Sequence, residues 1–238
     1  MSGIALVTIC TGRYSIFLDQ FLASFRERFV TEHSRTFFVF GDSPSRSESD
    51  VRQIYQKKLG WPYDTMMRFE MFNSVSNELS LHEYVFFLNV NMWCGTHVSA
   101  EEVLPDGGDG LVGVLHPGYY QTPPDQLPYE RRPESRLSIP IGSGGRYFQG
   151  CLIGGGARQF LDMSRVLADV ISRDLACGIV PVWHDESAMN WYYYTRDVKA
   201  LLPSFAYPES WDLPFPRRIV QLDKSKFGGH SYLRGDAA

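Results

Sequence analysis

Short apolar runs and amphipathic stretches alternate along the first part of the chain. Residues 4–9 (IALVTI) are apolar and largely β-branched, which predicts a buried strand of the parallel type. Residues 17–30 (FLDQFLASFRERFV) carry apolar side chains at helical spacing, which predicts an amphipathic helix. Residues 36–42 (TFFVFGD) predict a second strand. This β-α-β order is typical of an α/β sheet that binds its ligand at the carboxyl ends of the strands.

The same patterns continue to residue 194. Apolar, strand-like segments occupy 51–59, 83–90 (EYVFFLNV), 111–115 and 146–156. Helical spacing predicts helices over 64–81 and 159–177, and a further helix that starts within 180–194. Between them, residues 117–146 form a long excursion rich in Pro, Gly and charge, and long ordered loops of this kind are usually functional. The polar tail from residue 224 is predicted to be mobile when no ligand is bound.

Composition narrows the function classes. The chain has 238 residues, 44% of them hydrophobic, which predicts one large domain or two tightly fused halves. A net charge of −4 gives no indication of a nucleic-acid partner or an anionic membrane surface. The four cysteines lack CxxC spacing, so no structural zinc site is expected.

The beginning of the chain bears on its location. It lacks the basic n-region of a signal peptide, and no stretch approaches the ~20 apolar residues of a membrane span. These features favour a cytoplasmic protein with reduced thiols and no transmembrane segment.

The central strand, within FFLNVNMW, ends in Asn89-Val90-Asn91. Many nucleotide-sugar transferases carry Asp-x-Asp at the end of such a strand, where the carboxylates hold a divalent metal on the diphosphate. Here both carboxylates are replaced by amides. Three interpretations are open at this point: a transferase that works without a metal, an inactive one, or a protein of another kind.

The stretch WHDES, residues 183–187, is the strongest chemical signal. Three consecutive side chains, His184, Asp185 and Glu186, are ionisable, and buried carboxylates are costly unless they are paired. The structural alternative is a helix start with Asp185 as the N-cap and Glu186 in the first turn, which composition alone favours. Other motifs are weak when taken singly, among them Arg68, HPGYY (116–120), YERRP (129–133) and QGCLIGGG (149–156).

Taken together and in order, these motifs are specific. TICTGRY, GWPYDTMMRFEMF, FFLNVNMW, HPGYY, YERRPES, YFQGCLIGGG, VWHDES and GGHSYLR resemble glycosyltransferase family 6, which includes the blood-group A and B transferases and the α-1,3-galactosyltransferases. The resemblance covers nearly the whole chain. Vertebrate members carry Asp-Val-Asp and a Golgi anchor and stem; the amides and the lack of an anchor here resemble the bacterial, metal-independent branch.

The resemblance implies a fold and a reaction. The fold is α/β, a single GT-A domain over 1–238 with a Rossmann-like UDP-binding half (about 1–92), an acceptor and catalytic half (about 93–223) and a flexible tail (224–238). The reaction is a retaining transfer of galactose or N-acetylgalactosamine from a UDP-sugar to the 3-hydroxyl of a β-galactoside, often fucosylated as in the H antigen. Glycan-biosynthesis partners would hold such a cytoplasmic enzyme at the periphery of the inner membrane.

The resemblance also assigns roles to residues. Glu186 matches the candidate nucleophile and also an acceptor contact. Donor contacts are implied for Ile9, Cys10, Thr11, Tyr14, Arg68, Asn89, Val90, Asn91, Gln149, Gly150, Cys151, Asp185, Lys226 and Arg234. Acceptor contacts are implied for His116, Tyr119, Gln149 and Trp183.

Residue chemistry suits a site without a metal or other cofactor. Amides are poor ligands for hard cations, whereas Asn89 and Asn91 can donate hydrogen bonds and place no negative charge beside the diphosphate. Arg68 and basic residues of the tail would supply positive charge instead. Two alternatives stay open, a metal-dependent transferase with water bridging the amides to manganese, and a degenerate protein that binds UDP or carbohydrate.

The donor sugar and the route of retention are also open at this stage. The size of Cys151 leans toward galactose, but Gln149 is unlike the usual residue, so both donors are retained. Double displacement through Glu186 and same-face attack through an ion pair both fit the residues.

Overall fold

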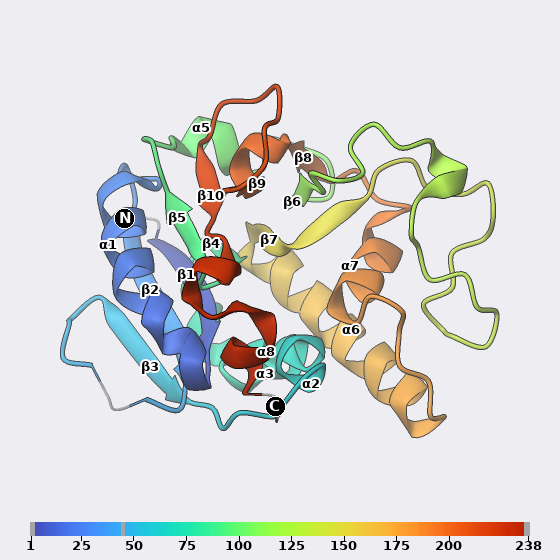
Figure 1. Cartoon of the computed structure of the whole chain (residues 1–238), viewed down its shortest axis with the longest axis horizontal. Helices are drawn as coiled ribbons and strands as arrows, with labels where there is room; N and C mark the ends of the chain where they lie inside the picture. The colour runs from blue at the N-terminus through green and yellow to red at the C-terminus, as the bar shows by residue number, and fades with distance from the viewer. Residues whose placement is uncertain (1–2, 44–45, 236–238) are drawn as a thin grey trace.

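A computed structural model describes residues 3–43 and 46–235, and its backbone is organised around one large sheet. The seven-stranded sheet has the order β3-β2-β1-β4-β7-β6-β8, and a three-stranded sheet has the order β5-β10-β9 (Figure 1). The large sheet consists of β1 (Gly3–Cys10), β2 (Ser34–Gly41), β3 (Val51–Tyr55), β4 (Tyr84–Leu88), β6 (Leu111–Leu115), β7 (Phe148–Gly156) and β8 (Lys199–Leu201). The small sheet consists of β5 (Met92–Cys94), β9 (Tyr207–Pro208) and β10 (Ile219–Gln221).

The strand directions decide which loops meet. β1 is parallel to β2 and β4, so the loops that follow β1 and β4 emerge at the same edge of the sheet. β7 runs antiparallel to β4, with Leu88 opposite Leu152, so the start of β7 reaches the same edge. The backbone N–H of Asn89 donates to the carbonyl of Cys151 at 2.9 Å. The sheet therefore brings Asn89–Asn91 and Gln149–Cys151 together.

Helices cover both faces of the large sheet. On one face, α1 (Leu18–Arg28), α5 (Ala100–Val103) and the small sheet share a buried cluster with Ile4 and Leu6 of β1. On the other face, α3 (Arg68–Ser74), α6 (Ala157–Ala176) and α7 (Asp185–Tyr193) share a cluster with Ala5 and Val7. Alternate residues of β1 thus feed two cores, as the two-residue period of a strand requires. This mixed, largely parallel architecture is that of a GT-A-like single domain and confirms the predicted fold class.

Remaining helical segments are short. They are η1 (Gly12–Phe17), α2 (Tyr63–Met66), α4 (Ser76–Leu79), η2 (Pro124–Gln126), η3 (Pro203–Ala206), η4 (Lys224–Phe227) and α8 (Gly229–Arg234). Among the described residues, no helix combines the length and apolar character needed to cross a membrane.

Two sequence predictions need correction. The helix expected over 64–81 is three short helices, α2, α3 and α4, because the backbone leaves helical geometry at Met67 and Val75. The strand expected over 51–59 ends at Tyr55, where its pairing with β2 ends. The small sheet was not predicted, since its strands are only two or three residues long.

The tail is folded against the rest of the molecule. Phe227 packs on Phe17 with ring centroids 4.7 Å apart, and Leu233 is 1% exposed. Arg13 donates to the carbonyl of Tyr232 at 2.6 Å, and Lys58 donates to that of Arg234. Residues 236–238 lie outside the described residues, and the mobility of the tail stays a prediction.

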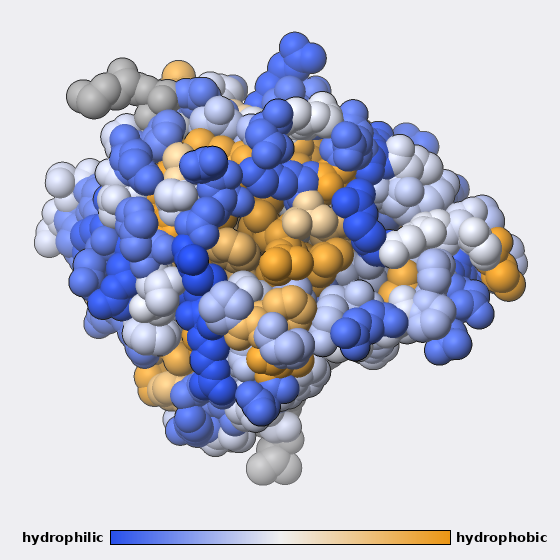
Figure 2. Space-filling model, turned by 90° about the horizontal axis from the view of Figure 1, so that it is seen from above, coloured by the Kyte–Doolittle hydropathy of each residue, from blue (hydrophilic) through white to orange (hydrophobic). Residues whose placement is uncertain are grey.

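Seen from above (Figure 2), much of the surface is hydrophilic, and the largest apolar area lies near the middle of the view. Figure 2 shows apolar side chains gathered near the middle of this view, surrounded by hydrophilic ones. Apolar atoms contribute much of any folded protein's surface, so the area does not by itself mark a binding site.

Candidate active site

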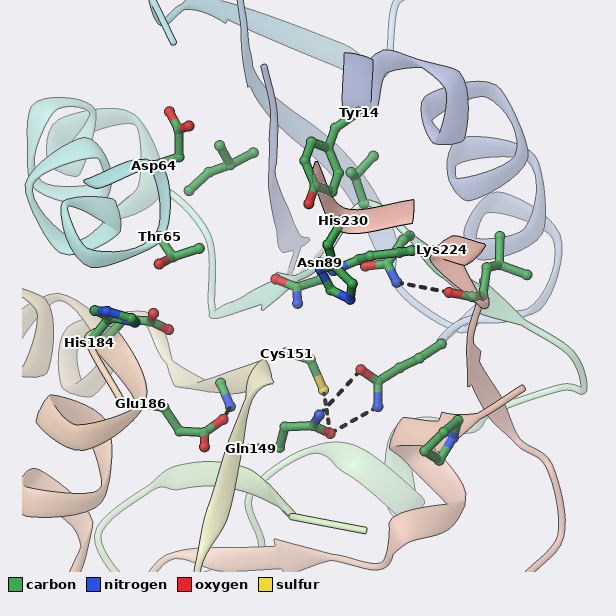
Figure 3. Close-up of a pocket in the computed structure, with 18 of the residues that line it drawn as sticks. Tyr14, Asp64, Thr65, Asn89, Gln149, Cys151, His184, Glu186, Lys224 and His230 are labelled. Atoms are coloured by element: carbon green, nitrogen blue, oxygen red, sulfur yellow. Dashed lines mark hydrogen bonds between the residues drawn. The ribbon is translucent and has the colours of Figure 1, made fainter. Parts of the chain in front are cut away.

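A cavity of about 640 Å³ opens at the edge of the sheet where β1, β4 and β7 meet. This volume is in the range of sites for small organic ligands. Most residues predicted to form the site line it, namely Ile9, Thr11, Tyr14, Arg68, Asn89, Val90, Asn91, His116, Gln149, Gly150, Cys151, Trp183, Asp185, Glu186 and Arg234. Figure 3 shows Glu186 and Gln149 on one side of this space, and Tyr14 and Lys224 on the opposite side. Cys10, Tyr119 and Lys226 do not line it.

The end of β1 shows why Cys10 is set apart. Ile9 and Thr11 line the cavity, whereas Cys10 is 2% exposed and packs into the core on the α1 side. Side chains alternate between the two faces of a strand, so Cys10, between Ile9 and Thr11, points to the opposite face from them and away from the cavity. Burial raises the pKa of the Cys10 thiol to about 12, so it stays protonated. A contact of the Cys10 side chain with a ligand in the cavity is not supported.

Arg68 forms a buried ion pair beneath the cavity. Its guanidinium is 4.3 Å from the centroid of Phe87, and it donates to the carbonyls of Thr65 and Gly150 at 3.0 and 2.5 Å. It also pairs with Asp185 at 3.1 Å. A side chain on Gly150 would place its Cβ 2.8 Å from the Asp185 carboxylate, so this close arrangement needs glycine there. We call Arg68, Gly150, Asp185 and Glu186 the cavity floor.

Glu186 is held by the same strand. It stands in the first turn of α7, where His184 adopts a φ of 54° just before the helix. The N-cap position is therefore His184 and not Asp185, so the predicted structural alternative for Asp185 is wrong. The backbone N–H of Gly150 donates to the Glu186 carboxylate at 2.9 Å. Burial nevertheless raises the pKa of Glu186 to about 7, and the neighbouring Asp185 charge adds to the shift.

Tyr147 lies behind Glu186. Its side chain is 2% exposed, and its hydroxyl makes no hydrogen bond of ordinary geometry with any residue that the structure describes. It is still close enough to Glu186 to lower the pKa of that carboxyl slightly, against the larger effect of burial. Tyr147 also makes edge-to-face contacts with His116 and Tyr119, with centroids 5.9 and 5.3 Å away. Sequence reasoning missed this residue, because a tyrosine in an aromatic-rich strand is usually a core residue.

Asn89-Val90-Asn91 stands where a metal-binding motif is expected in this class of fold. Val90 is 3% exposed, and the Asn91 amide donates to the carbonyl of Leu222 at 3.3 Å. Nearby carboxylates are engaged elsewhere: Asp64 accepts from Leu59 and Gly60, and Asp223 accepts from Ser225. Within 3–43 and 46–235, no three His, Cys, Asp or Glu side chains are grouped to hold a metal ion. These donors do not fit a divalent cation of the magnesium type.

The tail supplies the opposite wall. Lys224, His230 and Arg234 line the cavity, and we call them the tail wall. The Lys224 ammonium lies 5.5 Å from the centroid of Tyr14 and makes no hydrogen bond or ion pair with the described residues. Burial, with the nearby Arg234 charge, lowers its pKa to about 8. Arg234 stacks on Trp61 at 3.6 Å, and its buried Nε has no hydrogen-bond partner among the described atoms.

Lys224, and not the predicted Lys226, reaches the cavity. Both lie on η4, whose three-residue turn puts Lys224 and Phe227 on one side. Phe227 packs inward on Phe17, so Lys224 also faces inward. Lys226 points away and pairs with Glu209 at 2.6 Å. The apolar Phe227 three residues later is the signal in the sequence that distinguishes the two lysines.

Aromatic side chains line the remaining side of the cavity. Trp183 is 47% exposed, as is typical of a ring available to a ligand, and Trp211, which the sequence analysis did not single out, is 44% exposed. His116 accepts from the backbone N–H of Gly118 at 3.0 Å through Nδ1, so its proton resides on Nε2. Burial lowers its pKa to about 4, which keeps it neutral. Tyr119 packs on His116 with centroids 4.6 Å apart and supports it from behind.

Comparison with known proteins agrees with this geometry. Residues 2–230 match the model of glycosyltransferase family 6. The O-antigen biosynthesis glycosyltransferase WbnI of Escherichia coli is 30% identical over 221 residues, which cover 92% of this chain and 93% of WbnI. The rat histo-blood group ABO system transferase 1 is 30% identical over 87% of this chain and 61% of its own length. Globoside alpha-1,3-N-acetylgalactosaminyltransferase 1 of Gallus gallus is 29% identical over 93% of this chain and 67% of its own. The protein therefore belongs to glycosyltransferase family 6 and is a hexosyltransferase.

Proposed function

We propose that the enzyme transfers galactose or N-acetylgalactosamine from a UDP-sugar to the 3-hydroxyl of a β-galactoside, with retention at the anomeric carbon and without a metal. A fucosylated, H-antigen-like galactoside is the proposed acceptor. One observation carries the proposal: an ionisable carboxylate, Glu186, and the Lys224 ammonium, which pairs with no carboxylate of the described residues, line opposite sides of one cavity. The names of the relatives, a blood-group transferase and an α-1,3-N-acetylgalactosaminyltransferase, are consistent with it.

The charge distribution supports the direction in which the donor would lie. Transfer breaks the bond between the anomeric carbon and UDP, so positive charge develops on the sugar and negative charge on the diphosphate. The tail wall carries Lys224 and Arg234, which suits the diphosphate. The floor carries two carboxylates for one arginine, which suits an oxocarbenium-like sugar. Ile9, Thr11 and Tyr14 also line the cavity, with Tyr14 beside Lys224, and remain for uracil and ribose.

Glu186 would act as an anion in either retaining route. In double displacement its carboxylate bonds to the anomeric carbon as UDP leaves, and the acceptor hydroxyl then displaces the carboxylate and passes its proton to the released phosphate. In same-face attack it stabilises the sugar cation while the acceptor proton passes to the departing phosphate. Because ionised Glu186 is needed in both, kcat/KM should rise with pH through about 7, the pKa that burial gives this carboxyl.

The proposal of metal independence rests on donor chemistry. Asn89 and Asn91 offer amides where hard cations prefer carboxylates, and Asp64 and Asp223 already accept hydrogen bonds from the backbone. Lys224 and Arg234 offer the cationic charge that a diphosphate needs. No step of the proposed reaction requires a metal.

UDP release tests the proposal directly. It should be measured with UDP-galactose and with UDP-N-acetylgalactosamine, in EDTA, with and without 2′-fucosyllactose, for the wild-type enzyme and Glu186→Gln. Acceptor-dependent release in EDTA with one donor, lost in Glu186→Gln, is the expected result. Release only after manganese is added would contradict metal independence, and no release under either condition would contradict the proposed donors or acceptor. NMR of the product would show the α-1,3 linkage.

A further inference from the structure

Two glutamines on different sheets pair at the cavity wall. The amide of Gln149, on β7, donates to Oε1 of Gln221, on β10, at 3.3 Å. The amide of Gln221 donates back to Oε1 of Gln149 at 2.9 Å. Both side chains line the cavity, and dashed lines in Figure 3 mark these contacts at the labelled Gln149. The pair joins residues 72 positions apart in the sequence.

A third contact fixes which way each amide points. Nε2 of Gln221 also donates to the carbonyl of Ala206 at 2.7 Å. A carbonyl can only accept, so Gln221 must present nitrogen there and oxygen to the Nε2 of Gln149. The orientation of the Gln149 amide follows: its Nε2 faces Oε1 of Gln221, and its Oε1 faces Nε2 of Gln221. Ala206 ends η3, so the backbone of that segment sets the orientation of Gln221 and, through it, of Gln149.

Oε1 of Gln149 also accepts a hydrogen bond from the thiol of Cys151. Sγ of Cys151 donates to it at 3.3 Å, as Figure 3 shows. Oε1 of Gln149 therefore accepts two hydrogen bonds, and Nε2 uses one of its two hydrogens on Gln221. The other hydrogen has no acceptor among the described residues and is available to a ligand. The network thus determines both where the Cys151 sulfur points and which donor Gln149 presents.

We infer that Gln221 is a positioning residue that sets donor-sugar selectivity by orienting Gln149 and, through it, Cys151. This inference rests on the proposed function, together with the donor contacts that the family resemblance implies for Gln149 and Cys151, both of which line the cavity. Gln221 acts from β10, a strand that lies apart from them in the sequence and in the sheet order. Without it, Gln149 can rotate and the Cys151 thiol loses a fixed acceptor, so the two donors should be distinguished less well.

Selectivity is measured as the ratio of kcat/KM for UDP-galactose to that for UDP-N-acetylgalactosamine. Gln221→Met keeps the length of the side chain and removes its hydrogen bonds. Gln221→Glu keeps an acceptor for Gln149 but loses both donated bonds. Gln53→Met, on the distant strand β3, is the matched control, because Gln53 likewise both accepts a hydrogen bond, from the backbone N–H of Arg46, and donates one, to the carbonyl of Ser43. Thermal unfolding of each variant checks that it is folded.

Both Gln221 variants should move the selectivity ratio toward one by about five- to tenfold, the worth of one or two hydrogen bonds. Gln53→Met should leave the ratio unchanged. In a Gln149→Ala background, Gln221→Met should have no further effect on the ratio, since Gln221 acts through Gln149. An unchanged ratio in folded Gln221 variants, or a full effect without Gln149, would overturn the inference while the proposed function stands. A wild-type enzyme that uses neither donor would instead contradict the proposed function.

Discussion

The cavity floor and the tail wall both contain cationic side chains. The charge of Arg68, in the floor, is neutralised by a neighbouring carboxylate, whereas, within the part of the chain that the structure describes, the charges of Lys224 and Arg234 in the tail wall are not. Every side of the Arg68 guanidinium is occupied, by Asp185, by two carbonyls and by the ring of Phe87. Among the described residues, the Lys224 ammonium contacts the ring of Tyr14 but pairs with no carboxylate, and Arg234 leaves its buried Nε without a hydrogen-bond partner. The floor has more carboxylates than cations, whereas the cations of the tail wall are not paired with carboxylates of the described residues.

This difference indicates which cations are available to interact with an anionic ligand. A buried cation that is already paired positions its neighbours more than it attracts a ligand, because its field is largely cancelled. An unpaired cation in a low-dielectric site interacts strongly with an anion that enters. We therefore expect Arg68 to be needed chiefly for the architecture of the floor, and Lys224 chiefly for turnover.

Arg68→Met should have the largest effect on stability. It leaves the buried Asp185 carboxylate without its cation, which costs about 3–5 kcal/mol when one partner of a buried pair is removed. The free energy of unfolding in urea measures this. Adding Asp185→Asn should recover part of the loss, because it removes the stranded charge.

Arg52→Met is the control for Arg68. Arg52 forms an ion pair with Glu78 at 2.7 Å, but both side chains are more than 40% exposed. Its removal should cost no more than about 1 kcal/mol, as for other surface pairs. Equal losses in Arg68→Met and Arg52→Met would show that the floor is not neutralised in the way described.

Glu186→Gln should raise stability while it removes activity. Burial lifts the pKa of Glu186 from the ordinary 4.5 to about 7, so the folded state holds a proton that the unfolded state releases between these values. Wild-type stability therefore falls as the pH rises from 4.5 to 7 and is constant above. The variant should gain up to about 3 kcal/mol at pH 8 and nothing at pH 4.5. Urea titrations at both pH values test this, and a gain that is equal at both would point to packing and not to charge.

Lys224→Met should separate activity from stability. Loss of one preorganised cation facing the leaving group should lower kcat about 100-fold, or about 2.7 kcal/mol of transition-state stabilisation. Stability should not fall at pH 7, because the pKa of this lysine is lowered by burial, so its charge is a cost to the folded state. A steady-state assay and a urea titration measure the two effects.

Lys226→Met is the natural control, since it lies on the same short helix η4 but does not line the cavity, and its charge is paired with Glu209. It should change kcat less than about threefold. If both lysine variants lost the same activity, the tail would act through its fold and not through Lys224. Point variants are better suited than truncation, because removing the tail would also expose the core contacts of Phe227 and Leu233.

The two regions also differ in how far the sequence could predict them. The β-α-β opening and the polar ends of its strands follow from periodicity, so the edge of the sheet where Thr11 and Asn89 meet could be anticipated. The neutralisation of Arg68 by Asp185 could not be predicted from the sequence, because this ion pair depends on the start of β7 lying against the start of α7. Which tail lysine faces inward depends on a single turn of η4, where a shift of two residues exchanges Lys224 for Lys226.

Titration of Lys224 gives the finest test of the comparison. Its pKa is lowered to about 8, so UDP should bind less tightly as the pH rises above 8 and the ammonium loses its proton. Between pH 7 and pH 9 the Kd for UDP should increase about tenfold, and UDP binding at pH 9 should be accompanied by proton uptake. Calorimetry in two buffers of different ionisation enthalpy measures both quantities.

The Glu186→Gln enzyme is the appropriate background, since it removes the carboxyl that titrates near pH 7. His230 also belongs to the tail wall, but burial lowers its pKa from the ordinary value of 6.5, which moves its titration away from this interval. In Lys224→Met the pH dependence between 7 and 9 should vanish, whereas a dependence that survived would assign the anion-binding charge to another group.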